Sequence, residues 1–199
     1  MTREQAVAFF LFSVAAAGTP GPSNVLLTAV GANVGVLRGL PCLLGVGLGM
    51  ATMMFVVAFG LGGVLLDNPM ILQGVKWCGA AVLCWLAWKI ATATRGAGVG
   101  GDGRPVGLMA AATFQWVNPK SWLVSASAAA TFLDSGAGSA LGQSAGLGLV
   151  FLLACLPSCF PWLAFGAALQ RLLRSERAFR IFNGAMGALL ALSLILFLR

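Results

Sequence analysis

The sequence predicts an all-α integral membrane protein with six transmembrane helices, arranged as two inverted three-helix repeats. Hydrophobic residues make up 59% of the 199 residues and charged residues only 9%, whereas a soluble domain carries about 25% charged residues. Long stretches of the chain contain no charged residue at all. Proline motifs interrupt two such stretches at corresponding places in the two halves of the chain, so the first helix of each repeat is expected to be broken.

Four runs contain no charged residue and exceed the roughly 18 residues that a membrane-spanning helix needs: residues 5–37, 39–66, 135–170 and 181–198. Two further spans, at about 70–91 and 108–133, contain one or two lysines each. The six spans leave no room for a separate soluble domain. We expect no cleaved signal peptide, because Arg3 and Glu4 cancel and the apolar run continues well past Ala17.

A Gly-rich, polar stretch at residues 92–107 divides the chain, and we interpret it as a cytoplasmic linker between a first repeat (1–91) and a second repeat (108–199). In each repeat the second span is Gly-rich and the third is shorter. Because three is odd, the second triplet enters the membrane from the opposite side, as in the inverted repeats of transporters. Any six-helix protein can be divided into threes, so the matching prolines carry this prediction. The linker glycines match a dinucleotide fingerprint by chance, since that motif requires a βαβ unit.

Basic residues set the predicted orientation. Eight would lie on one side of the membrane and three on the other, which places the first group in the cytoplasm and both termini outside. The net charge of +7 then needs no nucleic-acid partner. The cytoplasmic group consists of Arg38, Lys89, Arg95, Arg104, Arg171, Arg174, Arg177 and Arg180, and the outer group of Arg3, Lys76 and Arg199.

The two breaks are Pro20-Gly21-Pro22 and Asn118-Pro119-Lys120, and each falls near the middle of its span. A proline in a helix interior costs ~3 kcal/mol or more. Broken backbone at membrane depth is tolerated only where protein or a water-filled cavity satisfies the freed groups. Two such breaks predict a transporter with its binding site at the membrane midplane, although simple kinks are the alternative.

Residue types at the breaks favour a site for a zwitterion. We expect helices to restart at Ser23-Asn24 and at Pro119, with Asn118 as N-cap. Each helix N-terminus would carry about half a positive charge, and Lys120 adds a full one, which favours a carboxylate. Carbonyl groups freed at 17–19 and 115–117 would accept hydrogen bonds from an ammonium group, helped by Asn24, Thr28, Thr113 and Gln115.

We therefore predict that the ligand is an amino acid. Acidic residues occur only at span ends or in loops, so neutral amino acids are favoured, and we hypothesise that Lys120 gains and loses a proton. No catalytic residue, metal ligand or cofactor is predicted. Trp116 and Trp122 flank the second break as lining or as packing residues. The predicted substrate-binding residues are Pro20, Gly21, Pro22, Ser23, Asn24, Thr28, Gln115, Asn118, Pro119 and Lys120.

The run from Thr19 to Leu27 resembles the amino-terminal signature of the lysine-exporter (LysE/RhtB) family of amino-acid efflux proteins, and Phe114 to Lys120 resembles its Asn-Pro-Lys motif. The glycines of residues 31–39 and 45–49 and the segment 79–89 are similar to the intervening family motifs. The resemblance implies proton-driven export of amino acids or related small metabolites across a bacterial inner membrane.

The chain departs from the family pattern at two positions. Met50 stands where the family often has an acidic residue, and Val82 stands where it often has tyrosine. The first departure argues against coupling through that acid and against a strongly cationic substrate.

Three alternatives remain from the sequence. Cys155 and Cys159 share a helix face and, with Met50, Met53 and Met54, could bind a soft metal cation for export. A non-transporting membrane scaffold would not need two breaks and a deep lysine. Nothing favours an enzyme, because there is no His and no acid pair within a span. Glycines repeated every four residues from Gly31 could serve a homodimer or packing within the chain.

Overall fold

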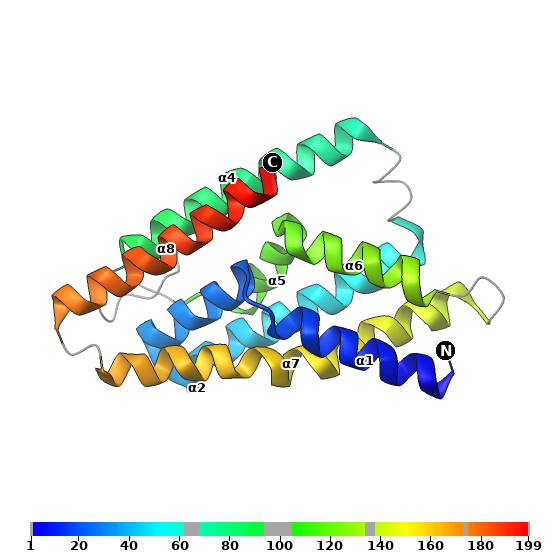
Figure 1. Ribbon diagram of the computed structural model, residues 1–199, viewed down its shortest axis with the longest axis horizontal. Helices are drawn as coiled ribbons and strands as arrows, with labels where there is room; N and C mark the ends of the chain where they lie inside the picture. Colours follow the sequence, from blue (N-terminus) through cyan, green and yellow to red (C-terminus); the bar gives the residue numbers. More distant parts are fainter. Residues whose placement is uncertain (1, 62–67, 94–104, 134–137, 173–174, 199) are drawn as a thin grey trace.

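The computed structural model describes residues 2–61, 68–93, 105–133, 138–172 and 175–198, and over these residues the protein is helical with no strand (Figure 1). The all-α prediction is confirmed. Most of the predicted linker, including its glycine motif, lies outside the described residues. The elements are α1 (Arg3–Gly18), α2 (Pro22–Val56), the π-helical η1 (Val57–Leu61), α4 (Pro69–Ala91), α5 (Leu108–Val117), α6 (Pro119–Phe132), α7 (Ala140–Leu172) and α8 (Glu176–Leu198).

The helix α2 contains a sharp bend at Gly35, whose φ of +78° belongs to the left-handed region that side chains disfavour. The chain reverses direction at this bend. As a result, the Val30 side chain lies 3.3 Å from the position that a Cβ on Gly39 would take. Figure 1 shows the blue segment before the bend and the cyan segment after it running in opposite directions. Thus α1 and residues 22–34 form one broken helix, and residues 36–56 form the next.

Both proline motifs interrupt helices as predicted. Between α1 and α2, Gly21 is extended and Pro22 takes the first helical position, so this helix begins one residue earlier than expected because proline suits that position. Between α5 and α6, Asn118 is the N-cap, and its side chain accepts a hydrogen bond of 3.1 Å from the backbone N–H of Lys120. The predicted cap at the second break is confirmed.

Backbone contact at glycines joins the two longest helices, α2 and α7. A Cβ on Gly31 would lie 2.1 Å from the carbonyl oxygen of Leu163, and one on Gly166 would lie 2.0 Å from that of Thr28. Likewise, a Cβ on Gly45 would lie 2.2 Å from the carbonyl oxygen of Leu108 in α5. Gly31 and Gly45 therefore serve packing within the chain, while Gly146 meets nothing within 4 Å.

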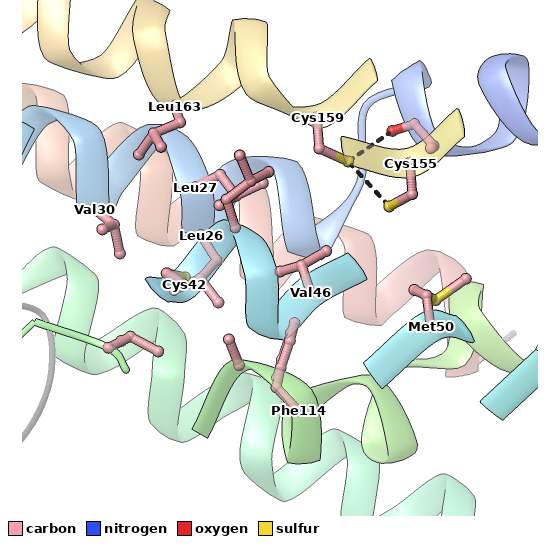
Figure 2. Packing of buried hydrophobic residues seen from close by; sticks show 14 of the residues in the cluster. Leu26, Leu27, Val30, Cys42, Val46, Met50, Phe114, Cys155, Cys159 and Leu163 are labelled. Atoms are coloured by element: carbon pink, nitrogen blue, oxygen red, sulfur yellow. Dashed lines mark hydrogen bonds between the residues drawn. The ribbon is translucent and has the colours of Figure 1, made fainter. Parts of the chain in front are cut away.

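The core lies between α2, α5 and α7, where side chains such as Leu26, Val46, Phe114 and Leu163 point toward one another (Figure 2). The helices α4 and α8 pack along each other (Figure 1). Many large apolar side chains face outward, including Trp77 and Trp88 on α4. In a membrane, such outward-facing groups would contact lipid rather than water.

Within the described residues, two stretches are long and apolar enough to cross a membrane: Pro22–Gly60, which reverses at Gly35 and is largely buried inside the protein, and Ala140–Gln170. Two shorter helices, Trp77–Ala91 and Leu108–Val117, are also apolar. Length and composition thus agree with membrane-spanning helices, and the arrangement of six spans stays a prediction.

Gly166→Ala tests the contact between α2 and α7. Its new methyl group would overlap a backbone oxygen that has no room to move, so we expect a loss of about 1–3 kcal/mol in stability and a lower thermal unfolding midpoint in detergent. Gly146→Ala, on the same helix but facing open space, is the control and should leave the midpoint unchanged or higher. Equal midpoints for the two variants would contradict the packing described here.

Candidate functional site

The two helix breaks meet through a small hydrogen-bond network. The Ser23 hydroxyl at the start of α2 donates to Gln115 Oε1 in α5 (2.9 Å) and accepts from Asn118 Nδ2 (3.0 Å). The Ser121 hydroxyl of α6 donates to the same Gln115 oxygen (3.0 Å). Predicted site residues from the two halves of the chain therefore lie in direct contact.

Lys120 connects the breaks a second time. Its ammonium Nζ donates a hydrogen bond to the carbonyl oxygen of Thr19, at the C-terminal end of α1. Gly21 makes room for this side chain, since a Cβ there would lie only 2.8 Å from Lys120 Cδ. A positive charge at a helix C-terminus is favourable because the freed carbonyls carry partial negative charge.

The carbonyl groups freed at the first break already have protein donors. Asn24 Nδ2 donates to the carbonyl oxygens of Ala17 (3.0 Å) and Thr19 (2.7 Å), and the Trp162 indole donates to that of Gly18 (3.2 Å). Side chains of the protein thus bind these oxygens in this structure, and the expectation that they accept hydrogen bonds from a ligand's ammonium group stays a prediction.

An indole also serves the second break. Trp122 Nε1 donates to the carbonyl oxygen of Trp116 (2.7 Å), and the two rings meet edge to face with centroids 6.1 Å apart. Trp122 therefore satisfies freed backbone, as Trp162 does at the first break. Trp162 is not among the predicted site residues, because nothing near it in the sequence indicates that it contacts α1.

A narrow pocket lies beside these contacts, with a cavity volume of about 30 Å³. That volume gives room for about two or three water molecules, so a larger ligand would need the surrounding helices to separate. Its polar lining consists of Ser23, Asn24, Asn118, Lys120 and Ser121. The remaining lining consists of Ala16, Ala17, Gly21, Val46, Met50, Val124, Phe151, Cys155 and Cys159.

Two thiols of α7 form part of the pocket wall, and Figure 2 shows them close together beside the first break. Cys159 Sγ lies 3.7 Å from Cys155 Sγ and 3.6 Å from both the Ala17 carbonyl oxygen and Asn24 Oδ1. Within the described ranges, no group of three or more His, Cys, Asp or Glu residues could hold a metal ion. Met50 lines the pocket, but Met53 and Met54 do not belong to its lining.

Some predicted site residues lie away from the pocket. Pro20 and Thr113 are exposed, and the Thr113 hydroxyl donates to the Met109 carbonyl of its own helix. Thr28 is buried but donates to the Asn24 carbonyl (2.9 Å). The prediction that Thr113 helps to bind the ligand's ammonium group is wrong, because that side chain faces outward. Gln115 lies behind the pocket wall as the acceptor for Ser23 and Ser121.

Comparison with known proteins gives one family. A family model described as LysE type translocator matches residues 14–199. No solved structure matches the chain significantly.

Curated relatives share the name cysteine/O-acetylserine efflux protein. The relative from Salmonella choleraesuis (strain SC-B67) is 30% identical over 188 residues, which cover 94% of this chain and 92% of the relative. The relative from Escherichia coli O139:H28 (strain E24377A / ETEC) is 30% identical over 196 residues, covering 98% and 96%. The relative from Escherichia coli (strain K12) is 32% identical over 134 residues, covering 67% and 68%.

Gln115→Ala tests the network that joins the breaks. It removes the acceptor shared by two hydroxyl groups, and leaving a buried donor unpaired costs about 1–3 kcal/mol. We expect a lower thermal unfolding midpoint in detergent than for the wild type. Thr113→Ala, two residues away on the outer face, is the matched control and should change the midpoint much less. Equal thermal unfolding midpoints for the two variants would show that the network does not stabilise the protein.

Proposed function

The chain belongs to the LysE type translocator family, and we propose that it exports amino acids with short uncharged side chains, or closely related metabolites, across a bacterial inner membrane. Family membership makes it a membrane transport protein. Relatives that match nearly its whole length are named for efflux of cysteine and O-acetylserine, and both of these are neutral amino acids. Those names support the general cargo class proposed for this chain.

One observation carries the proposal: the Lys120 ammonium group meets the Thr19 carbonyl oxygen at the edge of the pocket. An amino acid presents the complementary pair of charges. Its carboxylate would bind the ammonium of Lys120, and its own ammonium would replace Lys120 at the carbonyl group of Thr19. The zwitterion thereby inserts into an existing hydrogen bond and leaves neither protein group unpaired.

The pocket lining favours a neutral side chain. No Asp or Glu among the described residues lines this pocket, and Met50 is buried in its wall at the position where the family resemblance leads one to expect an acid. A cationic side chain would lose its hydration without gaining a counter-charge, and it would lie close to the ammonium of Lys120. Both effects oppose binding of lysine or arginine.

The order of the elements supports two inverted repeats. A broken helix (α1 with residues 22–34, then α5 with α6) comes first in each half, and α4 and α8, which would be the third spans, have 23 residues each. Elements at equivalent positions contact each other: Gly47 in the second span of the first half lies against Leu152 and Leu156 of α7, and α4 packs along α8. In this arrangement the pocket lies at the midplane, the basic loops face the cytoplasm and both termini face outward.

The proton gradient is proposed to drive export, with Lys120 as the residue that gains and loses the proton. Among the described residues, those that line the pocket include no acidic side chain; its other titratable side chains are the thiols of Cys155 and Cys159. Loss of the proton from Lys120 would remove the charge that binds the cargo's carboxylate, so the protonation state of Lys120 would control binding and release of the cargo.

Lys120→Ala tests the site directly. Cells preloaded with labelled neutral and basic amino acids should export one or a few neutral ones through the wild type, and an uncoupler should stop this export. The variant, at matched membrane expression, should lose roughly tenfold or more of the rate, because a charge-assisted contact is missing. Full proton-driven export by Lys120→Arg would eliminate the proton-carrier role, and a wild type that exports no amino acid would eliminate the proposal.

Gly21→Ala tests the position of the Lys120 ammonium group without removing its charge. Gly21 is extended, with a φ of −177°, so alanine fits the backbone, but its methyl group would displace the lysine stem from Thr19. We expect export to fall several-fold while the protein still reaches the membrane. Gly18→Ala, beside open space, is the control. Normal export by Gly21→Ala would separate the Lys120–Thr19 contact from transport.

A further inference from the structure

We propose that Cys155 and Phe151 of α7, with Met50 of α2, form the side-chain subsite of this pocket and limit the length of the side chain that the protein exports. This inference rests on the proposed function, because it assumes an amino acid held between Lys120 and Thr19. It assigns the part of the pocket that the charged groups of the cargo do not use.

Residues of α7 line the pocket turn by turn. Phe151, Cys155 and Cys159 are four residues apart, so they lie on one face of the helix, and four residues correspond to a rise of about 6 Å. All three are buried, at 1%, 1% and 2% exposed, and all three line the pocket. They therefore mark successive depths along one wall.

Contacts establish which end of this wall lies near the charged groups. Cys159 Sγ touches Asn24 Oδ1 and the Ala17 carbonyl oxygen (3.6 Å each), and Asn24 donates to the Thr19 carbonyl that also binds Lys120. Cys155 Sγ lies 3.7 Å beyond Cys159 Sγ. Phe151 follows one further turn along, at about 12 Å from Cys159 measured along the helix axis.

The depths correspond to side-chain lengths. A side chain of three or four bonds extends roughly 4–5 Å, so it would pass Cys159 and end near Cys155. A longer or branched side chain would meet Met50 and the Phe151 ring, which also line this cavity of only about 30 Å³. The α7 wall of the pocket therefore limits the length of the cargo's side chain.

The chemistry of the subsite selects against charge as well as length. Thiol, thioether and aromatic groups are weakly polar and polarizable, so they pack well against a thiol, an ester or a short alkyl group. They offer no counter-charge to a carboxylate or an ammonium, whose desolvation would stay uncompensated. The cargo class is thus a short side chain that is apolar or weakly polar.

Phe151→Ala tests the length limit. Removing the ring opens the end of the subsite, and a hydrophobic pocket discriminates by about 10–200-fold for one methylene group. We expect export of leucine, whose side chain is branched, to rise at least tenfold relative to alanine over the wild-type ratio. The ratio is measured on preloaded cells with one labelled mixture, which cancels differences in expression.

Leu147→Ala is the matched control. Leu147 is fully buried, lies one turn beyond Phe151 on α7 and does not belong to the pocket lining. It loses a comparable amount of core packing, so the leucine-to-alanine ratio should stay at the wild-type value. A rise in both variants would reflect general loosening of the helix and would overturn the assignment.

The opposite change gives a second, independent test. Cys155→Leu places bulk at the middle depth, so we expect export of cysteine, and of any larger amino acid, to fall relative to that of alanine. If Phe151→Ala does not reach the membrane, Met50→Ala widens the same end and should raise the leucine-to-alanine ratio. Unchanged ratios in variants that still export would overturn the subsite alone, whereas no amino-acid export by the wild type would overturn the proposed function as well.

Discussion

Backbone groups released at two helix breaks determine which side chains cross between the helices of this protein. Each break leaves carbonyl groups without a partner in their own helix, and the protein supplies donors from elsewhere. Lys120 crosses from α6 to Thr19, Asn24 bonds back to Ala17 and Thr19, and Trp162 reaches Gly18 from α7. The two breaks lie together because one of them supplies a donor that the other needs.

Close backbone packing makes that exchange possible. The side chain of Trp162 reaches the end of α1 because α7 is packed tightly against α2, and this approach depends on the absence of side chains at Gly31 and Gly166. The same closeness leaves a cavity of only about 30 Å³. The tight packing of the helices thus also makes the pocket small, and a larger ligand can bind only if the helices move apart.

Features that depend only on neighbouring residues could be predicted from the sequence. The structure agrees with three predictions that follow from neighbouring residues: Pro119 at the first helical position, Asn118 as a cap and the two helix-breaking motifs. Contacts between distant residues did not follow. Nothing near Trp162 or Cys159 in the chain indicates that either meets the first break, and the outward direction of Thr113 depends on how α5 packs. The apolar pattern placed the boundary between the first two spans a few residues after Gly35, where the chain reverses in the structure.

The contact between Lys120 and Thr19 has a consequence for a carrier that has just released its cargo. An empty site with an unpaired cation would resist being enclosed by apolar helices, because the charge would lose its hydration with nothing in return. Here the ammonium group folds back onto a carbonyl group of the same protein. If the chain exports amino acids as proposed above, the unloaded protein would therefore close with this cation already paired and would need no bound ligand to do so.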